Sequence, residues 1–235
     1  MKKIIVLTLC LALMLSLIFS VSAAEVIASG VCGENLTWPL DNEGTLTISG
    51  TGDMWDWSYN GTPWSIYTPI IKKVVLAEGI TNIGEFAFSS CASLESVEMP
   101  DGITSIELNA FEGCGNLESI EIPNSVTDIF DNAFFCCKSL KQINIPTSIN
   151  HLSRSVFAGC TSLESIVIPQ GVTSIGPYAF QGCSSLETVS IPKSVDSISH
   201  EVFDCCDSLM AINVDENNEK YSSKDGVLFE GKTRL

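Results

Sequence analysis

Six cysteines recur at a fixed interval of 23 residues, and their thiols are the side chains of this sequence with the widest range of possible chemistry. Thiols form disulfides, ligate metals or act as nucleophiles. The chain has no C-x-x-C pair and only two histidines, and a position repeated six times is not typical of a catalytic nucleophile. We therefore expect no metal site, no cofactor and no enzymatic activity. The six are Cys91, Cys114, Cys137, Cys160, Cys183 and Cys206.

The cysteines belong to a longer repeated pattern, roughly [IV]-T-x-I-x-x-x-A-F-x-x-C-x-x-L-x-x-[IV]-x-I-P. Phenylalanine, leucine, proline and isoleucine recur in the same register as the cysteines. Six columns in register over six copies indicate an internal repeat, which is the sequence signature of a repeat architecture. The units are 80–102, 103–125, 126–148, 149–171, 172–194 and 195–217.

Each unit has the pattern of one short strand followed by a compact turn. In "LESIEIP", residues 117–123, the apolar residues end in period-2 alternation, and the proline ends the strand because it cannot donate to a ladder. We interpret the "AFxGC" stretch as one helical or 3₁₀ turn on the opposite side, closed by Gly113, Gly159 and Gly182 in three units. Such a unit cannot bury its apolar side alone, so the units are predicted to stack into a solenoid.

Stacking also predicts the state of the cysteines. Equivalent positions lie about 4.8 Å apart in neighbouring turns of a parallel sheet, with side chains parallel. A disulfide would tilt both side chains off their shared rotamer, so we predict free, buried thiols that donate weakly to turn carbonyls. Cys136 and Cys205 precede the row by one residue and are interpreted as partly exposed small residues at a turn position.

The repeat resembles the BspA-like class of bacterial leucine-rich repeats over about residues 71–217. The segment 29–57, "SGVCGENLTWPLDNEGTLTISGTGDMWDW", resembles the segment that often precedes such repeats in secreted proteins of anaerobic gut-type bacteria. The resemblance implies a leucine-rich-repeat solenoid, with a parallel β-sheet on one face, short helical or 3₁₀ turns opposite and a β-rich N-terminal cap. It also implies a surface or secreted protein, and several members are regarded as adhesins.

Residues 1–24 have the layout of a secretory signal peptide: two lysines, a long apolar run and small residues. We expect cleavage near Ala23 or Ala24, with an uncleaved anchor as the alternative. No second long apolar stretch follows, so we expect no membrane insertion after cleavage and a secreted or extracellular cell-surface location. The formal net charge of −16 repels phosphate backbones and argues against a nucleic-acid partner.

The segments flanking the repeats differ from them in composition. Residues 25–70 are predicted to form a β-rich, aromatic N-terminal cap, and residues 71–217 the repeat solenoid, beginning with a strand in "IIKKVVLAEG". Residues 218–235 break the period and predict a hairpin, which is either a C-terminal cap or the start of a further segment. All four tryptophans lie in 38–64. They either cover the open end of the first turn, or form an aromatic platform for sugar rings from Trp55, Trp57, Tyr59 and Trp64.

The remaining functional surface is the sheet face, where the outward strand positions are small, polar or charged. We expect the ligand-binding residues there to be Glu95, Glu98, Glu118, Ser119, Glu121, Lys141 and Asn144. Three hypotheses follow. The first is a non-enzymatic module for protein–protein interaction or adhesion, whose ligand is a host or neighbouring-cell surface protein. The second is a carbohydrate-binding module that uses the tryptophan cluster. The third is a structural spacer of a larger surface protein.

Overall fold

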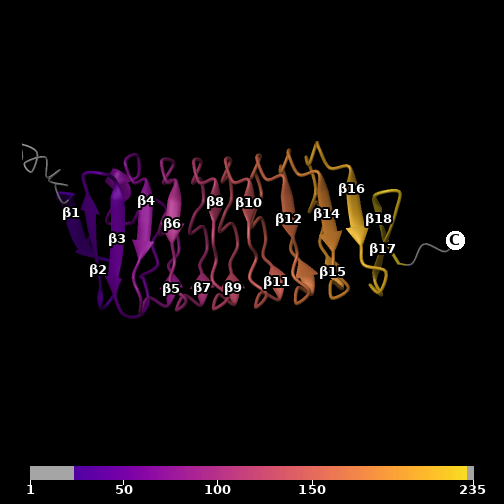
Figure 1. The fold of residues 1–235 in the computed structure, drawn as a ribbon, viewed down its shortest axis with the longest axis horizontal. Coiled ribbons are helices and arrows are strands. Elements are labelled where there is room, and N and C mark those ends of the chain that lie inside the picture. The colour runs from indigo at the N-terminus through magenta and orange to yellow at the C-terminus, as the bar shows by residue number, and fades with distance from the viewer. Residues whose placement is uncertain (1–23, 232–235) are drawn as a thin grey trace, which may run out of the picture.

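The computed structural model describes residues 24–231, so the predicted signal peptide lies almost entirely outside the described residues. The chain forms a β-solenoid in which one turn follows another along a single axis (Figure 1). Strands of three residues or so alternate with turns, and the one helical segment among the described residues is the 3₁₀ helix η1, Ser65–Tyr67. Within residues 24–231 no helix has the length and apolarity to cross a membrane.

Two parallel ladders run along the axis. The first, the sheet face, continues the strand predicted in each unit. Its strands are β4 (Lys73–Leu76), β6 (Ser96–Glu98), β8 (Ser119–Ile120), β10 (Gln142–Ile143), β12 (Ser165–Val167), β14 (Thr188–Ile191) and β16 (Ala211–Val214). The register confirms the 23-residue period, since Ser165, for example, pairs with Thr188 and Thr188 with Ala211. Ladder pairing is interrupted between β6 and β8 and again between β10 and β12.

The second ladder was not predicted and lies along the other side of the solenoid (Figure 1). It is built from the "T-x-I" positions of each unit, and each proline opens the turn that leads to it; Val126 N, for example, donates to Pro123 O at 3.1 Å. Proline, which has no backbone N–H, suits a position that does not have to donate a hydrogen bond to a ladder. The strands are β5 (Asn82–Ile83), β7 (Ser105–Ile106), β9 (Asp128–Ile129), β11 (His151–Leu152), β13 (Ser174–Ile175) and β15 (Ser197–Ile198).

The predicted helical or 3₁₀ turn at "AFxGC" is wrong. In residues 109–113 the backbone bends through consecutive turns, and Asn109 and Gly113 both have positive φ, 55° and 72°. These left-handed residues break helical geometry and aim alternate N–H groups along the axis: Phe111 N donates to Ala133 O, and Gly113 N to Phe135 O, both at 2.8 Å. The N–H groups between them donate three residues back along the chain, as from Glu112 N to Asn109 O at 3.1 Å, so bonds within and between turns together satisfy the backbone. Gly113, Gly159 and Gly182 do close the turns, as predicted.

The core lies between the ladders and consists of the repeated columns. In the second unit Phe111, Cys114 and Leu117 are fully buried, and Ile120 and Ile122 nearly so, which confirms the predicted inward set. Neighbouring phenylalanine rings stack from Phe88 to Phe203 with centroids 5.4–5.8 Å apart. Such pairs are worth about 0.5–1.5 kcal/mol each beyond the area they bury.

The cysteine row forms part of this core. The nine cysteines within residues 24–231 are free thiols, and five of the six in the row are buried, Cys206 being half-buried. Each thiol from Cys114 to Cys206 donates to a carbonyl of the previous turn, as from Cys114 Sγ to Phe88 O at 3.2 Å. This confirms the predicted weak donor role. Cys136 is half-buried and Cys205 exposed, and both have positive φ like the glycines they replace.

The N-terminal segment joins the solenoid through the sheet. Strands β1 (Val26–Val31), β2 (Leu36–Asp41) and β3 (Thr45–Gly50) form an antiparallel meander, and β3 then pairs in parallel with β4. The ring of Trp64 stacks on Phe88, and Trp38 packs edge-on against Trp64. These are the contacts expected of residues that cover the first turn.

At the other end, β17 (Tyr221–Lys224) and β18 (Val227–Glu230) form the predicted hairpin, which lies against β16. Asn218 is only 1% exposed and occupies the position that Val195 holds one turn earlier. Its Nδ2 donates to Pro192 O and Val195 O, and its Oδ1 accepts from the backbone N–H groups of Lys220 and Tyr221, all at 2.8–2.9 Å. A fully satisfied amide thus joins the hairpin to the last turn.

Candidate functional site

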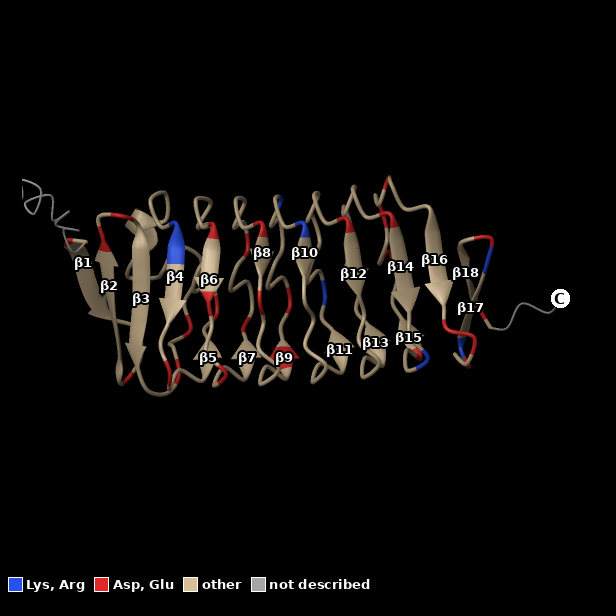
Figure 2. Cartoon of the chain, viewed as in Figure 1, with Lys and Arg blue, Asp and Glu red and all other residues tan. Residues whose placement is uncertain are grey.

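The sheet face presents three outward columns along the axis. Figure 2 shows acidic residues at the start of β6, β8, β12 and β14, and basic residues at the start of β4 and β10. All seven residues predicted as the protein-binding site are exposed on this face: Glu95, Glu98, Glu118, Ser119, Glu121, Lys141 and Asn144. They come from three consecutive turns, and stacking brings them together although the first and the last are 49 residues apart in the sequence.

Ion pairs between turns partly compensate the acidic charge of the face. Lys73 Nζ lies 2.5 Å from Glu98 Oε1, and Lys141 Nζ lies 2.8 Å from Glu118 Oε2. The hydrogen bond from Lys141 to Glu118, together with the carboxylate charge, raises the pKa of Lys141 above its ordinary value. Both pairs are solvent-exposed and so contribute little to stability. Among the described residues neither Glu95 nor Glu121 forms such an ion pair, so these two carboxylates carry the least compensated charge of the four.

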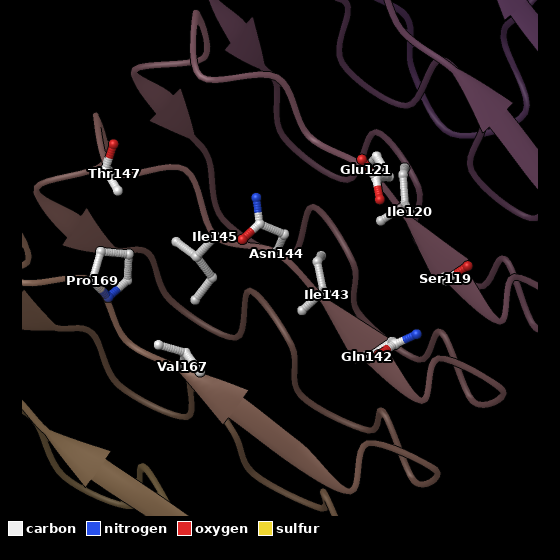
Figure 3. Close-up of a pocket in the computed structure, with 10 residues that line it drawn as sticks. All are labelled: Ser119, Ile120, Glu121, Gln142, Ile143, Asn144, Ile145, Thr147, Val167 and Pro169. Atoms are coloured by element: carbon white, nitrogen blue, oxygen red, sulfur yellow. The ribbon is translucent and has the colours of Figure 1, made fainter.

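A hollow of about 390 Å³ lies on the same face, over three consecutive turns, where β10 and β12 are not ladder-paired. The predicted residues Ser119, Glu121 and Asn144 line it (Figure 3). The other polar wall residues are Gln142 and Thr147, and Val167 and Pro169 form the apolar side. The arrangement offers hydrogen-bonding groups and one carboxylate beside an apolar wall.

Sequence reasoning missed Val167 as a site residue. Its side chain is 78% exposed, although valine is normally buried in this fold. Its neighbours in the column, Asn144 and Ser190, are polar, so an apolar residue between polar neighbours was the available signal. Only the structure shows that this valine borders a hollow.

A second hollow, of about 390 Å³, lies near the start of β6 and β8 and is lined by Glu95, Asn116, Glu118 and Ser139. Its carboxylates belong to the predicted site, and Glu118 is already paired with Lys141. Within residues 24–231 no group of three or more His, Cys, Asp or Glu side chains is arranged to hold a metal ion.

The structure separates the four residues of the predicted aromatic platform. Trp64 is fully buried, and its Nε1 donates to Ala87 O at 2.8 Å, so its ring is not accessible to a sugar and its inclusion in the platform is wrong. Trp57 is half-buried between Trp55 and Trp64. Trp55 and Tyr59 are 45% and 59% exposed and are the accessible rings of the cluster.

Comparison with known proteins shows the same architecture in three bacterial structures. A leucine-rich repeat protein from Eubacterium ventriosum is 29% identical, with a TM-score of 0.57, over 86% of this chain and 48% of its own. A leucine rich cell surface protein from Faecalibacterium prausnitzii is 26% identical, with a TM-score of 0.69, over 88% and 59%. The leucine-rich repeat protein of T. pallidum is 27% identical, with a TM-score of 0.60, over 77% and 79%.

The chain thus spans about half the length of the first of these proteins and three fifths of the second. A separate comparison with curated proteins found no match. A family model described as the BspA type leucine-rich repeat region matches residues 66–166 and 150–225, which is most of the chain and includes all six repeat units. The chain belongs to the family of BspA type leucine-rich repeat proteins.

Proposed function

We propose that this chain is a non-enzymatic module that binds protein ligands through its sheet face, on the cell surface or outside the cell. The observation that carries the proposal is the hollow on the sheet face, which is lined by Ser119, Glu121 and Asn144 from successive turns. Solenoid sheets commonly serve as extended binding surfaces. The cell-surface description of the F. prausnitzii protein supports the proposed location.

The electrostatics of the face favour a basic segment of the partner. The chain carries 28 acidic against 12 basic residues, and Glu95 and Glu121 add exposed carboxylates on the face itself. Complementary charge steers association and disfavours wrong partners. An acidic partner, including a second copy of this chain, would be repelled.

The test is a selection from a phage-displayed library of random 12-residue peptides against the immobilised chain. Recovered peptides are then measured on Glu118→Lys/Glu121→Lys and on the matched control Glu34→Lys/Glu78→Lys, which reverses two exposed carboxylates away from the face. We expect at least a tenfold loss of affinity, or about 1.4 kcal/mol, on the first variant and little change on the second. Failure to recover peptides, or equal binding to both variants, would overturn the proposal.

A second candidate function, carbohydrate binding, rests on the exposure of Trp55 and Tyr59. Aromatic faces beside carboxylates such as Asp53 and Asp56 suit sugar rings, and both carboxylates are in exposed residues. A glycan array that compares the chain with Trp55→Ala/Tyr59→Ala tests this candidate. Glycan binding that disappears in the variant supports it, and binding that is absent or unchanged removes the platform.

A further inference from the structure

Two hollows on the sheet face share one wall residue. The hollow of about 390 Å³ beside Glu121 and the next one, of about 330 Å³ beside Asn213, are both lined by Val167. Glu121, Asn144, Val167, Ser190 and Asn213 occupy one column at successive turns. The two hollows therefore lie next to each other along the solenoid axis with Val167 between them, and we call the two hollows together the Val167 groove.

The length of the Val167 groove follows from the repeat. Glu121 and Asn213 are four turns apart, which corresponds to about 19 Å at about 4.8 Å between neighbouring strands. A peptide in the polyproline II conformation advances about 3.1 Å per residue with three residues per turn, so the groove accommodates about six residues. Side chains three residues apart in such a peptide lie on the same side and about 9 Å apart, which matches the two turns between Glu121 and Val167.

The chemistry of the groove is asymmetric. Val167, with 78% of its surface exposed, provides an apolar contact at the middle, and Pro169 lies in the wall beside it. Glu121 supplies a carboxylate in an exposed residue at one end. At the other end Asp215 is half-buried, and its Oδ1 already accepts hydrogen bonds from Asn217. The carboxylate available to a ligand is therefore the one at the Glu121 end.

We propose that the Val167 groove binds a peptide segment in the polyproline II conformation that carries a basic side chain three residues from an apolar one. The basic side chain pairs with Glu121, and the apolar side chain packs on Val167. The intervening residues lie beside the amide of Asn144, which can both donate and accept hydrogen bonds. This inference rests on the proposed protein-binding function and names the ligand class of the same face.

The peptides recovered from the random library provide the test, because their sequences are not designed to fit. We expect a shared pattern of Lys or Arg followed three residues later, in one direction of the chain, by Leu, Ile, Val, Met or Phe. Each peptide is then measured on Val167→Lys, which places a cation in the groove, and on the matched control Val227→Lys. Val227 is 56% exposed on β18, in the C-terminal hairpin, and does not line either hollow. Both positions are exposed, so neither substitution removes a core contact.

We expect at least a tenfold loss of affinity on Val167→Lys and less than a twofold change on Val227→Lys. Peptides that lose affinity for Glu118→Lys/Glu121→Lys but bind Val167→Lys with unchanged affinity would contradict binding in the Val167 groove. Such a result would leave the proposed binding function of the sheet face intact. Peptides without the basic and apolar pair would also contradict binding in the Val167 groove. Peptides insensitive to every substitution on the face would overturn the proposed function itself.

Discussion

The indole ring of Trp64 stacks on the phenyl ring of Phe88, with centroids 5.8 Å apart and an interplanar angle of 18°. Trp64 thereby extends the row of stacked phenylalanines by one ring beyond the repeats. It also anchors itself, since its Nε1 donates to Ala87 O at 2.8 Å. The N-terminal segment and the solenoid consequently share one core as well as one sheet.

Truncating the buried Trp64 is expected to destabilise the protein more than truncating the exposed Trp55. Trp64→Ala should cost about 3–5 kcal/mol, as large-to-small changes of buried aromatic residues do. Trp64→Phe keeps a stacking ring and loses one hydrogen bond, for about 1 kcal/mol. Urea unfolding followed by circular dichroism measures both. Trp55→Ala, at a 45% exposed position, is the control, and an equal loss for Trp55→Ala and Trp64→Ala would contradict the shared core.

The thiols are expected to divide into classes of reactivity under native conditions. Cys205 is exposed and should react first with a thiol reagent, followed by the half-buried Cys136 and Cys206. The six buried cysteines should react only after unfolding, because the reagent cannot reach them. Mass spectrometry of labelled peptides assigns each modification. Rapid native labelling of Cys114 or Cys137 would contradict the packing of the row.

Stability is expected to fall as the pH rises above 9. Burial raises the pKa of the Cys91 thiol from 9.0 to about 12, and the pKa values of Cys114 and Cys137 are also raised. Between pH 9 and 12 the unfolded thiols lose protons that the folded thiols keep, so the unfolded state is favoured. Each such thiol contributes a slope of about 1.4 kcal/mol per pH unit.

The variants Cys91→Ala and Cys205→Ala separate this effect from other alkaline titrations. Cys91→Ala should reduce the pH dependence of the unfolding free energy by about 1.4 kcal/mol per pH unit between pH 9 and 12. Cys205→Ala, at an exposed position, is the matched control. If the unfolding free energies of the two variants had the same pH dependence, the raised pKa of the buried Cys91 thiol would be contradicted.

Asn218 is expected to control how firmly the C-terminal hairpin attaches. Asn218→Ala leaves the carbonyls of Pro192 and Val195 and the N–H groups of Lys220 and Tyr221 without the partners they have now, at a cost of about 1–3 kcal/mol. The hairpin should then open locally more often than the whole protein unfolds. Trypsin should therefore cleave faster after Lys220 and Lys224. Asn217→Ala, at an exposed position, is the control. Equal cleavage rates in the two variants would contradict the role of Asn218.

The repeated part of this fold could be predicted because every inward position recurs six times. Phe111, Cys114 and Leu117 each have copies 23 residues away, so the period fixes the stack, and the alternation fixes which side of the strand is buried. The turn at Asn109–Gly113 could not be predicted as it is, because alternate N–H groups, such as those of Phe111 and Gly113, donate to the next turn instead of along the chain. The second ladder was missed because its strands, such as Ser105–Ile106, are two residues long and carry no periodicity of their own.

The candidate site could be predicted in part for the same reason. The outward positions Glu118, Ser119 and Glu121 follow from the alternation that buries Ile120 and Ile122. The outward position of Val167 follows from the same alternation, but the hollow beside it is formed by three stacked turns and could not be read from the sequence. Trp64 and Trp55 are only nine residues apart in a non-repeating segment, where no period distinguishes a buried ring from an exposed one.

The most direct test of protein binding by the sheet face is a photo-crosslinking footprint of a peptide recovered from the random library. A benzoylphenylalanine is placed at Asn144 on the sheet face, at Thr104 beside the second ladder, or at Tyr59 in the aromatic cluster; all three positions are exposed. The account predicts crosslinking at Asn144, suppressed by excess unlabelled peptide, and background levels at the other two positions. Crosslinking at Thr104 or Tyr59 without crosslinking at Asn144 would contradict it.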